Sequence, residues 1–286
     1  MFDIEDLQKK ATELRLKTIQ AIHKANVGHP GGSLSVMDIL VTLYYADLHG
    51  QPIMKYDPKK PGWEDQDYLV LSKGHAAPAL YSVLADLGFF ENDELNYLSK
   101  MNAMLTSTPN QKIPGVTVTT GSHGHGFAKA HGMAMALKLD RKPNKVFAVL
   151  SDAELQNGLV WETALAAAHY KSDNLYTFID NNELMADGTT RSIMNVDPLA
   201  EKFESFGWRV FKVLNGHNYE DLMNAIDKAF SNARKPTAII CKTIKGRGVT
   251  FAERKAGYHN VPFSEPEMKE AVADLEATLE ELNNPK

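Results

Sequence analysis

Two apolar segments, each followed by a polar side chain, most constrain the fold of this chain. Residues 145–150 form one run and residues 175–179 form the other, with Asp152 just past the first and Asn182 just past the second. Continuous apolar runs of this length are typical of strands that are covered on both faces. A helical pattern over residues 159–168 lies between them. The sequence therefore predicts a strand–helix–strand unit.

The polar side chains that follow the two strands are expected to meet. In a right-handed strand–helix–strand unit the strands are parallel, so their carboxyl ends lie at one edge of the sheet. A carboxylate and an amide oxygen suit a hard dication such as Mg2+, which also takes phosphate oxygens and water. A helix that opens near Ala153 would direct its free N–H groups at the same place, which favours a phosphate. The plain alternative is that Asp152 and Asn182 only cap loops.

The order of Asp152 and then Asn181-Asn182 resembles the thiamine-diphosphate motif. In that motif the Asp, the second Asn and the carbonyl two residues beyond bind Mg2+ and the diphosphate. By this resemblance the metal ligands are Asp152, Asn182 and the backbone oxygen of Leu184.

Four further segments narrow the resemblance to the transketolase family. They are short turns rich in glycine, most of them carrying histidine, and they stand in the family's order: residues 25–33, 71–76, 119–126 and 243–249, the last followed by His259. The resemblance is colinear from about Ala11 to His259. A chain of 286 residues is similar to the first part of a transketolase, which implies the N-terminal, diphosphate-binding subunit of a split transketolase.

The resemblance also implies which residues form the site. His29, His75 and His259 are the expected catalytic residues, because imidazoles can hydrogen-bond sugar hydroxyls and relay protons near pH 7. Lys73, Lys245 and Arg247 are candidates to neutralise phosphate charge, and only Lys245 has motif support. The expected cofactor-binding residues are His75, Gly121, Ser122, His123, Asp152, Ala153, Glu154, Asn182, Leu184, Lys245 and His259.

The activity implied by the resemblance is group transfer with thiamine diphosphate and Mg2+ as cofactors. A two-carbon ketol group would pass from a ketose phosphate to an aldose phosphate, as in the pentose phosphate pathway. In the family, a glutamate that activates the cofactor comes from a second, pyrimidine-binding domain. We therefore expect this chain to be inactive alone and to need a separate C-terminal subunit, with two copies of each in an α2β2 assembly.

Four departures from the family pattern concern the substrate more than the cofactor. His123 replaces an apolar residue, Ala153 replaces a glycine, and Asn157 replaces a glutamate that faces the dimer partner. Thr108-Pro109-Asn110 stands where a His-Pro pair supplies a further histidine. Two alternatives therefore stay open: a carboligase that uses an α-keto acid or a modified sugar, and a non-catalytic subunit that only binds a partner.

The alternation of strands and helices predicts an α/β fold with a doubly wound, mostly parallel sheet and helices on both faces. The pattern predicts a helix over residues 4–25 and a strand over residues 237–241. We expect residues 1–264 to form the thiamine-diphosphate-binding domain. Residues 265–286 are expected to be a helical extension, because apolar residues recur there every three to four positions.

Composition and charge agree with an ordinary globular protein. The chain is 43% hydrophobic and 23% charged, and its net charge of −5 gives no sign of nucleic-acid binding. Its single cysteine, Cys241, falls in a predicted buried strand. The first residues are acidic where a secretory signal is basic, and no apolar run is long enough to span a bilayer. We expect a cytoplasmic enzyme that contacts no membrane.

Overall fold

A parallel β-sheet forms the centre of the computed structural model, which describes residues 2–231 and 234–284. All of its strand pairs are parallel, in the order β3-β4-β5-β7-β6. Its strands are β3 (Tyr68–Leu71), β4 (Val146–Ser151), β5 (Leu175–Asn181), β6 (Arg209–Val213) and β7 (Thr237–Lys242). A separate antiparallel pair is formed by β1 (Asp47–Leu48) and β2 (Gln51–Pro52).

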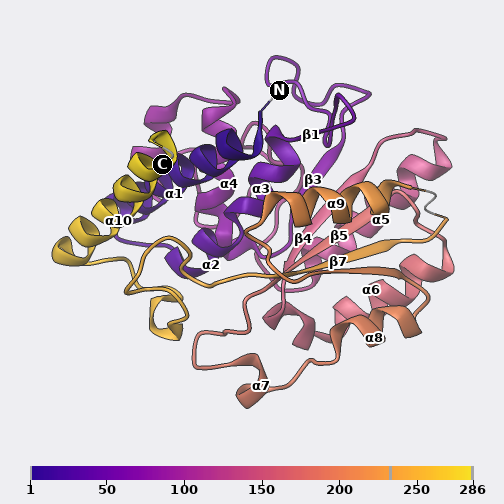
Figure 1. Ribbon diagram of the computed structural model, residues 1–286. Coiled ribbons are helices and arrows are strands. Elements are labelled where there is room, and N and C mark those ends of the chain that lie inside the picture. The colour runs from indigo at the N-terminus through magenta and orange to yellow at the C-terminus, as the bar shows by residue number, and fades with distance from the viewer. Residues whose placement is uncertain (1, 232–233, 285–286) are drawn as a thin grey trace.

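Helices cover this sheet and follow the strands along the chain (Figure 1). The α-helices are α1 (Ile4–Ala25), α2 (Pro30–Ser35), α3 (Met37–Tyr45), α4 (Ala77–Asp86), α5 (His125–Leu139), α6 (Gly158–His169), α7 (Thr190–Ile193), α8 (Leu199–Ser205), α9 (Tyr219–Phe230) and α10 (Glu265–Asn283). Short 3-10 helices are η1 (Gly74–Ala76), η2 (Asn92–Tyr97), η3 (Ala153–Gln156) and η4 (Ala256–Tyr258).

Burial of β4 on both faces explains why its residues 146–150 are all apolar. Val146, Ala148 and Leu150 belong to one buried cluster, which includes residues of α5, α6 and α8. Phe147 and Val149 point to the other face and belong to a second cluster, which includes residues of α3, α4 and α9. Because neighbouring residues of a strand face opposite sides, a strand with helices on both sides needs apolar side chains throughout. The predicted doubly wound α/β fold is confirmed.

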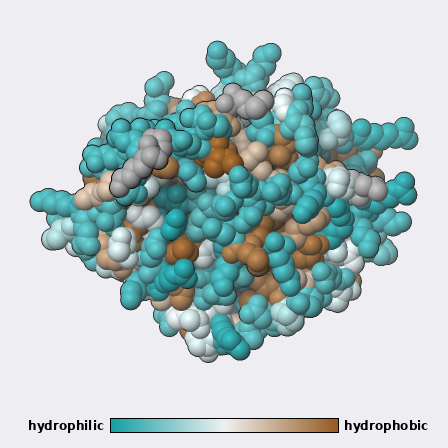
Figure 2. Space-filling model, in the orientation of Figure 1, coloured by the Kyte–Doolittle hydropathy of each residue, from teal (hydrophilic) through white to brown (hydrophobic). Residues whose placement is uncertain are grey.

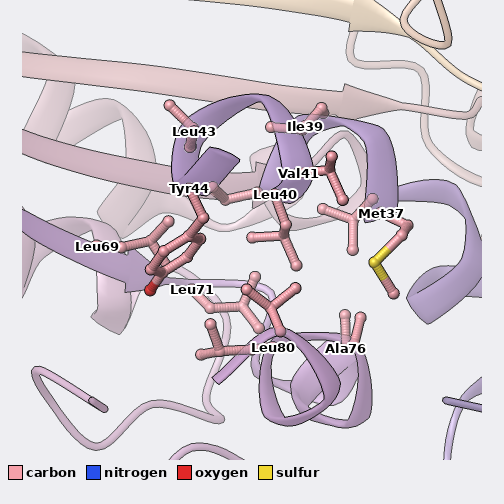
Figure 3. Close-up of a cluster of buried hydrophobic side chains, with 14 of the residues drawn as sticks. Met37, Ile39, Leu40, Val41, Leu43, Tyr44, Leu69, Leu71, Ala76 and Leu80 are labelled. Carbon is pink, nitrogen blue, oxygen red and sulfur yellow. The ribbon is translucent and has the colours of Figure 1, made fainter. Parts of the chain in front are cut away.

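The densest part of the second cluster lies where α3 and α4 meet β3. Figure 3 shows Leu40 and Leu80 between these helices and the strand residues Leu69 and Leu71. Every residue of α3 is buried. This packing fixes the helical layer that precedes and follows β3, and so fixes the loop that carries His75.

The predicted helical segment between β4 and β5 is divided into two helices. Residues 153–156 form the 3-10 helix η3, and α6 begins only at Gly158. Asn157 between them has extended backbone and caps α6, its side chain accepting a hydrogen bond from Leu159 N. The predicted helix opening near Ala153 is therefore present as a 3-10 helix, and the cap at Asn157 separates it from α6.

The C-terminal helix α10 packs against α1, as Figure 1 also shows. Met268, Ala271 and Leu275 share a buried cluster with Ile19 of α1 and with Val249. The helix thus buries apolar side chains of α1 and of the segment around Val249. The division into residues 1–264 and a helical extension stays a prediction, and its residues 1, 232–233 and 285–286 lie outside the described residues.

Much of the face seen in Figure 2 is hydrophilic, with hydrophobic patches between the polar side chains. Large apolar side chains are exposed at several separate places along the chain, among them Met101, Leu139 and Leu214. Among the described residues, every helix is too short or too polar to pass through a bilayer.

The two-sided burial of β4 predicts a large difference between two leucine substitutions. Leu150→Ala should lower the free energy of unfolding by about 2–5 kcal/mol, because it leaves a cavity in a fully buried position. Leu139→Ala, at a position that is 81% exposed, should change it by about 0.5 kcal/mol or less. Equal losses in urea denaturation would contradict the assigned core.

Candidate active site

The carboxyl ends of β4 and β5 bring Asp152 and Asn182 together, as the sequence predicted. Strand register pairs Ser151 with Asp180, so the residues that follow are neighbours. Asp152 Oδ1 accepts a hydrogen bond from Ala153 N at 2.8 Å, and its Oδ2 accepts one from Glu183 N at 2.6 Å. Asn182 Oδ1 accepts from Leu184 N at 3.1 Å. One carboxylate thus ties the end of β4 to the turn after β5.

The electrostatics of this edge suit a bound cation. Asp152 is 1% exposed, and burial together with the neighbouring Asp180 carboxylate raises the pKa of Asp152 to about 7. Burial and the neighbouring carboxylate oppose ionisation of Asp152, and a bound dication would stabilise the ionised form. The oxygens of Asp152, Asn182 and the Leu184 carbonyl are the donors that Mg2+ prefers. These residues fit the predicted metal, and their role as its ligands stays a prediction.

Three histidines from distant loops form a cluster. The ring centroids of His29 and His75 are 5.3 Å apart, those of His29 and His259 are 5.3 Å apart, and those of His75 and His259 are 5.4 Å apart. The ring of His123 lies 5.9 Å from that of His75, and His123 is exposed. The fold therefore brings the three predicted catalytic histidines together, with a fourth at their edge.

Close backbone approach makes this cluster possible. A Cβ atom on Gly31 would lie 2.8 Å from Tyr258 O, and one on Gly74 would lie 2.9 Å from the backbone of Gly121. Real Cβ atoms do not approach other atoms so closely, so only glycine fits at these two positions. The glycine-rich motifs thus allow the loops that carry the histidines to touch.

Lys245 connects the histidine cluster to the turn after β5. Its Nζ donates to Leu184 O at 3.1 Å and to Met185 O at 2.9 Å, and lies 2.8 Å from His259 Nδ1. An ammonium group has only donors, so His259 Nδ1 accepts and its Nε2 carries the proton. Lys245 is 2% exposed. It therefore sets the tautomer of His259 as well as placing a positive charge beside the predicted metal ligands.

All three histidines of the cluster are held neutral. Burial, and then the ammonium of Lys245, lower the pKa of His259 to about 3. Burial and the same ammonium lower the pKa of His29, and burial with the Lys73 ammonium lowers the pKa of His75 well below its usual range. A neutral imidazole carries one donor and one acceptor, which is what a sugar hydroxyl needs from its partner.

Glu154 lies behind the turn of residues 121–124, which is predicted to contact the cofactor. It is fully buried and accepts hydrogen bonds from the Ser72 hydroxyl and from Gly124 N, the latter at 2.7 Å. It therefore holds the turn that contains Gly121, Ser122 and His123 against the loop after β3. A buried side chain with these partners supports the turn, whereas Ser122 and His123 themselves are exposed.

Two of the three candidate phosphate-neutralising cations are engaged elsewhere. Lys73 is fully buried and pairs with Asp180, while it also donates to Gly32 O at 2.9 Å. Arg247 pairs with Glu253 at 3.3 Å and lines a 420 Å³ cavity. That cavity also contains the buried Asp38. Lys73 is therefore neutralised by a carboxylate of the protein, and a phosphate-neutralising role of Arg247 stays a prediction.

The sequence reasoning missed Asp180, whose carboxylate connects three of the segments around the site. This carboxylate is fully buried and accepts from Lys73, from the hydroxyl of Thr243 and from the hydroxyl of Ser35, the last at 2.6 Å. The available signal was a charged residue at the end of an apolar strand, two positions before Asn182. Asp180 precedes the Asn181-Asn182 motif and is not part of it, so the resemblance did not identify it.

The family departures find local explanations. Ala153 is the first residue of η3 and does not have a positive φ, so its methyl group costs no backbone strain. Asn157 caps α6. Thr108 lies beside the cofactor turn, since a Cβ on Gly121 would be 3.5 Å from its side chain. Thr108 thus lies beside Gly121, and Asn157 lies beside Gly124 of the same turn.

The lowered pKa of His259 predicts its titration. Its folded-state pKa lies below the unfolded value of about 6.5, so its neutral form should persist from pH 8 to pH 5. Its contribution to stability is full above about pH 6.5 and is lost as the pH falls from there towards 3. NMR of the ring protons, assigned with His259→Asn, measures this directly. Lys245→Met should raise the pKa by removing the ammonium. A wild-type midpoint near 6.5 would contradict the geometry.

Comparisons with known proteins identify the family of this chain. Residues 7–279 match the family model of the transketolase thiamine diphosphate binding domain. The chain is 41% identical, over 95% of its own length and 96% of the relative's, to the 6-deoxy-6-sulfo-D-fructose transketolase subunit SqwG of Clostridium sp. strain MSTE9. It is 34% identical to one subunit of the apulose-4-phosphate transketolase of Phocaeicola vulgatus, over 98% of its length and 97% of the relative's.

Full-length relatives match over one part only. Human transketolase is 36% identical over 97% of this chain and 43% of its own. The solved transketolase of Campylobacter jejuni superposes with a TM-score of 0.88 at 30% identity, over 98% of this chain and 46% of the other. The chain thus spans about half the length of these transketolases. The resemblance to the N-terminal subunit of a split transketolase is confirmed, and the chain belongs to the transketolase family, of which it carries the thiamine-diphosphate-binding domain.

Proposed function

We propose that this chain is one half of a two-subunit transketolase. It would transfer a two-carbon ketol group from a ketose phosphate to an aldose phosphate. The observation that carries the proposal is the joining of two groups at one sheet edge: the oxygen donors around Asp152, and the neutral cluster of His29, His75 and His259. The first group suits a metal-bound diphosphate and the second suits a sugar.

The Mg2+ ion would be held by Asp152, Asn182 and the carbonyl of Leu184. When bound, thiamine diphosphate supplies the electron sink that stabilises the transferred two-carbon group. The turn of Gly121 and Ser122 would receive its ring system, because Glu154 holds that turn rigidly at the edge of the histidine cluster. The positive charge of Lys245 beside Leu184 would favour the diphosphate.

The three histidines would act on the sugar. Because each is neutral, it can donate a hydrogen bond to one hydroxyl oxygen and accept a hydrogen bond from another hydroxyl. His259 has its Nδ1 occupied by Lys245, so its Nε2–H is the group available to a substrate oxygen. His29 is a better candidate than His75 to accept a proton, because burial and the Lys73 ammonium lower the pKa of His75 well below its usual range.

The second subunit would supply the pyrimidine-binding domain, and the assembly would contain two copies of each chain. Support comes from two relatives that are themselves named as transketolase subunits and that this chain covers almost entirely. A cytoplasmic location and a place in sugar-phosphate metabolism belong to the same proposal, since a charged sugar phosphate does not cross a membrane freely.

Cofactor binding tests the metal ligands. Asp152→Asn should weaken Mg2+-dependent binding of thiamine diphosphate at least tenfold, because it removes the only carboxylate among the predicted ligands. Isothermal titration calorimetry of the full chain measures this. Asp187→Asn provides the matched control, since Asp187 is exposed in the same segment and should leave the affinity unchanged. Equal affinity of wild type and Asp152→Asn would contradict the assignment.

Reconstitution tests the need for a partner. The purified chain should give no detectable ketol transfer, and activity should return on addition of a chain that carries the pyrimidine-binding domain. The readout is a coupled assay of aldose formation at fixed cofactor concentration. Turnover by the chain alone would disprove the two-subunit proposal. A reconstituted pair that binds cofactor yet never turns over would favour a non-catalytic role.

A non-standard donor is the second candidate, favoured by Thr108 and His123 beside the cofactor turn. The two named relatives concern a sulfonated ketose and a ketose phosphate, so an anionic ketose is the best-supported class. With the reconstituted pair, 6-deoxy-6-sulfofructose, xylulose 5-phosphate and pyruvate should be compared by kcat/KM. We expect an anionic ketose to exceed pyruvate by at least tenfold, and a preference for pyruvate would instead support a carboligase.

A further inference from the structure

A buried row of polar groups runs from Lys73 to the predicted metal ligand Asn182. Lys73 Nζ pairs with Asp180 Oδ2, and the Ser35 hydroxyl donates to the same oxygen at 2.6 Å. Asn182 Nδ2 then donates to Ser35 Oγ at 3.4 Å. Lys73, Asp180 and Ser35 are fully buried, and Asn182 is 9% exposed. Water therefore has little access to these groups and does not compete for their hydrogen bonds.

The direction of each hydrogen bond in this row is fixed by charge. Lys73 Nζ, which has only donors, pairs with Asp180 Oδ2, and the Thr243 hydroxyl donates to Asp180 Oδ1, so donors surround this carboxylate. The ionised carboxylate can only accept hydrogen bonds. Ser35 has one hydroxyl proton, and its nearby acceptors are Asp180 Oδ2 and Gly32 O, which is 3.2 Å away. Towards Asn182 the hydroxyl can therefore only accept.

This polarity determines which end of the Asn182 amide faces Ser35. The NH2 end can donate to the hydroxyl oxygen, whereas a flipped amide would place oxygen against oxygen. With Nδ2 turned to Ser35, Oδ1 accepts from Leu184 N at 3.1 Å and keeps a second lone pair. Asp152 Oδ2 accepts a hydrogen bond from Glu183 N in the same turn.

We propose that Ser35 and Asp180 are positioning residues that select the oxygen of the Asn182 amide for the metal. The inference rests on the proposed function, because it needs a cation beside Asp152 and Asn182. It assigns work to two residues that would not touch the metal or the substrate. Residues behind metal ligands typically contribute a tenfold to hundredfold effect on metal affinity.

The first test measures Mn2+ affinity of the full chain in the presence of thiamine diphosphate, by electron paramagnetic resonance of free Mn2+. Ser35→Ala should weaken Mn2+ binding about tenfold, because the amide loses the partner that holds its orientation. Ser82→Ala is the matched control, since Ser82 is also a fully buried, hydrogen-bonded serine but lies in α4. It should leave the Mn2+ affinity within about twofold of wild type.

The second test combines Ser35→Ala with Asn182→Asp. A carboxylate offers oxygen at both ends, so its orientation no longer matters, and Ser35→Ala should then cost less than about twofold in Mn2+ affinity. An equal loss in both backgrounds would overturn the proposal and leave Ser35 with a general structural role. Unchanged affinity of Ser35→Ala in the wild-type background would also overturn it. Failure of the wild-type chain itself to bind Mn2+ with thiamine diphosphate would instead overturn the proposed function.

Discussion

The buried ion pair between Asp180 and Lys73 is the interaction on which the rest of the site depends. Asp180 stands on the central strand β5, and Lys73 stands in the loop after β3 that also carries His75. Removing one partner of such a pair leaves an unpaired charge in the interior, at a cost of about 3–5 kcal/mol. Because Asp180 also accepts from Ser35 and Thr243, the same carboxylate holds α2 and the end of β7. One charge thus joins segments that are far apart in the sequence.

This support has consequences for the chemistry at the surface. The segments that it joins carry His29, His75 and Lys245, and Lys245 contacts His259. The ring centroids of His29, His75 and His259 lie within about 5.4 Å of one another. Neutral histidines close together are stable only when burial and nearby ammonium groups oppose their protonation. Lys73 and Lys245 provide those ammonium groups. The two lysines therefore lower the pKa values of the histidines, whether or not a phosphate is bound.

The sequence predicted strands β4, β5 and β7, the sheet class and the meeting of Asp152 with Asn182, because apolar runs and parallel pairing are determined locally. It also predicted that His29, His75 and His259 would meet, but only through a resemblance, since their spacing in the chain carries no distance information. Asp180 could not be recognised as a support, because its partners lie more than 60 residues away in the chain. The division of the helical segment between β4 and β5 was missed because Asn157 fits both a loop and a helix cap.

The central claim is that this chain is the diphosphate-binding part of a transketolase, completed by another chain. Its most direct test is a crystal structure of the chain with its partner, Mg2+ and thiamine diphosphate. The account predicts a metal bound by Asp152, Asn182 Oδ1 and the Leu184 carbonyl, with the cofactor's ring system between the two chains beside His123. A cofactor bound away from this edge, or a metal that omits both Asp152 and Asn182, would contradict it.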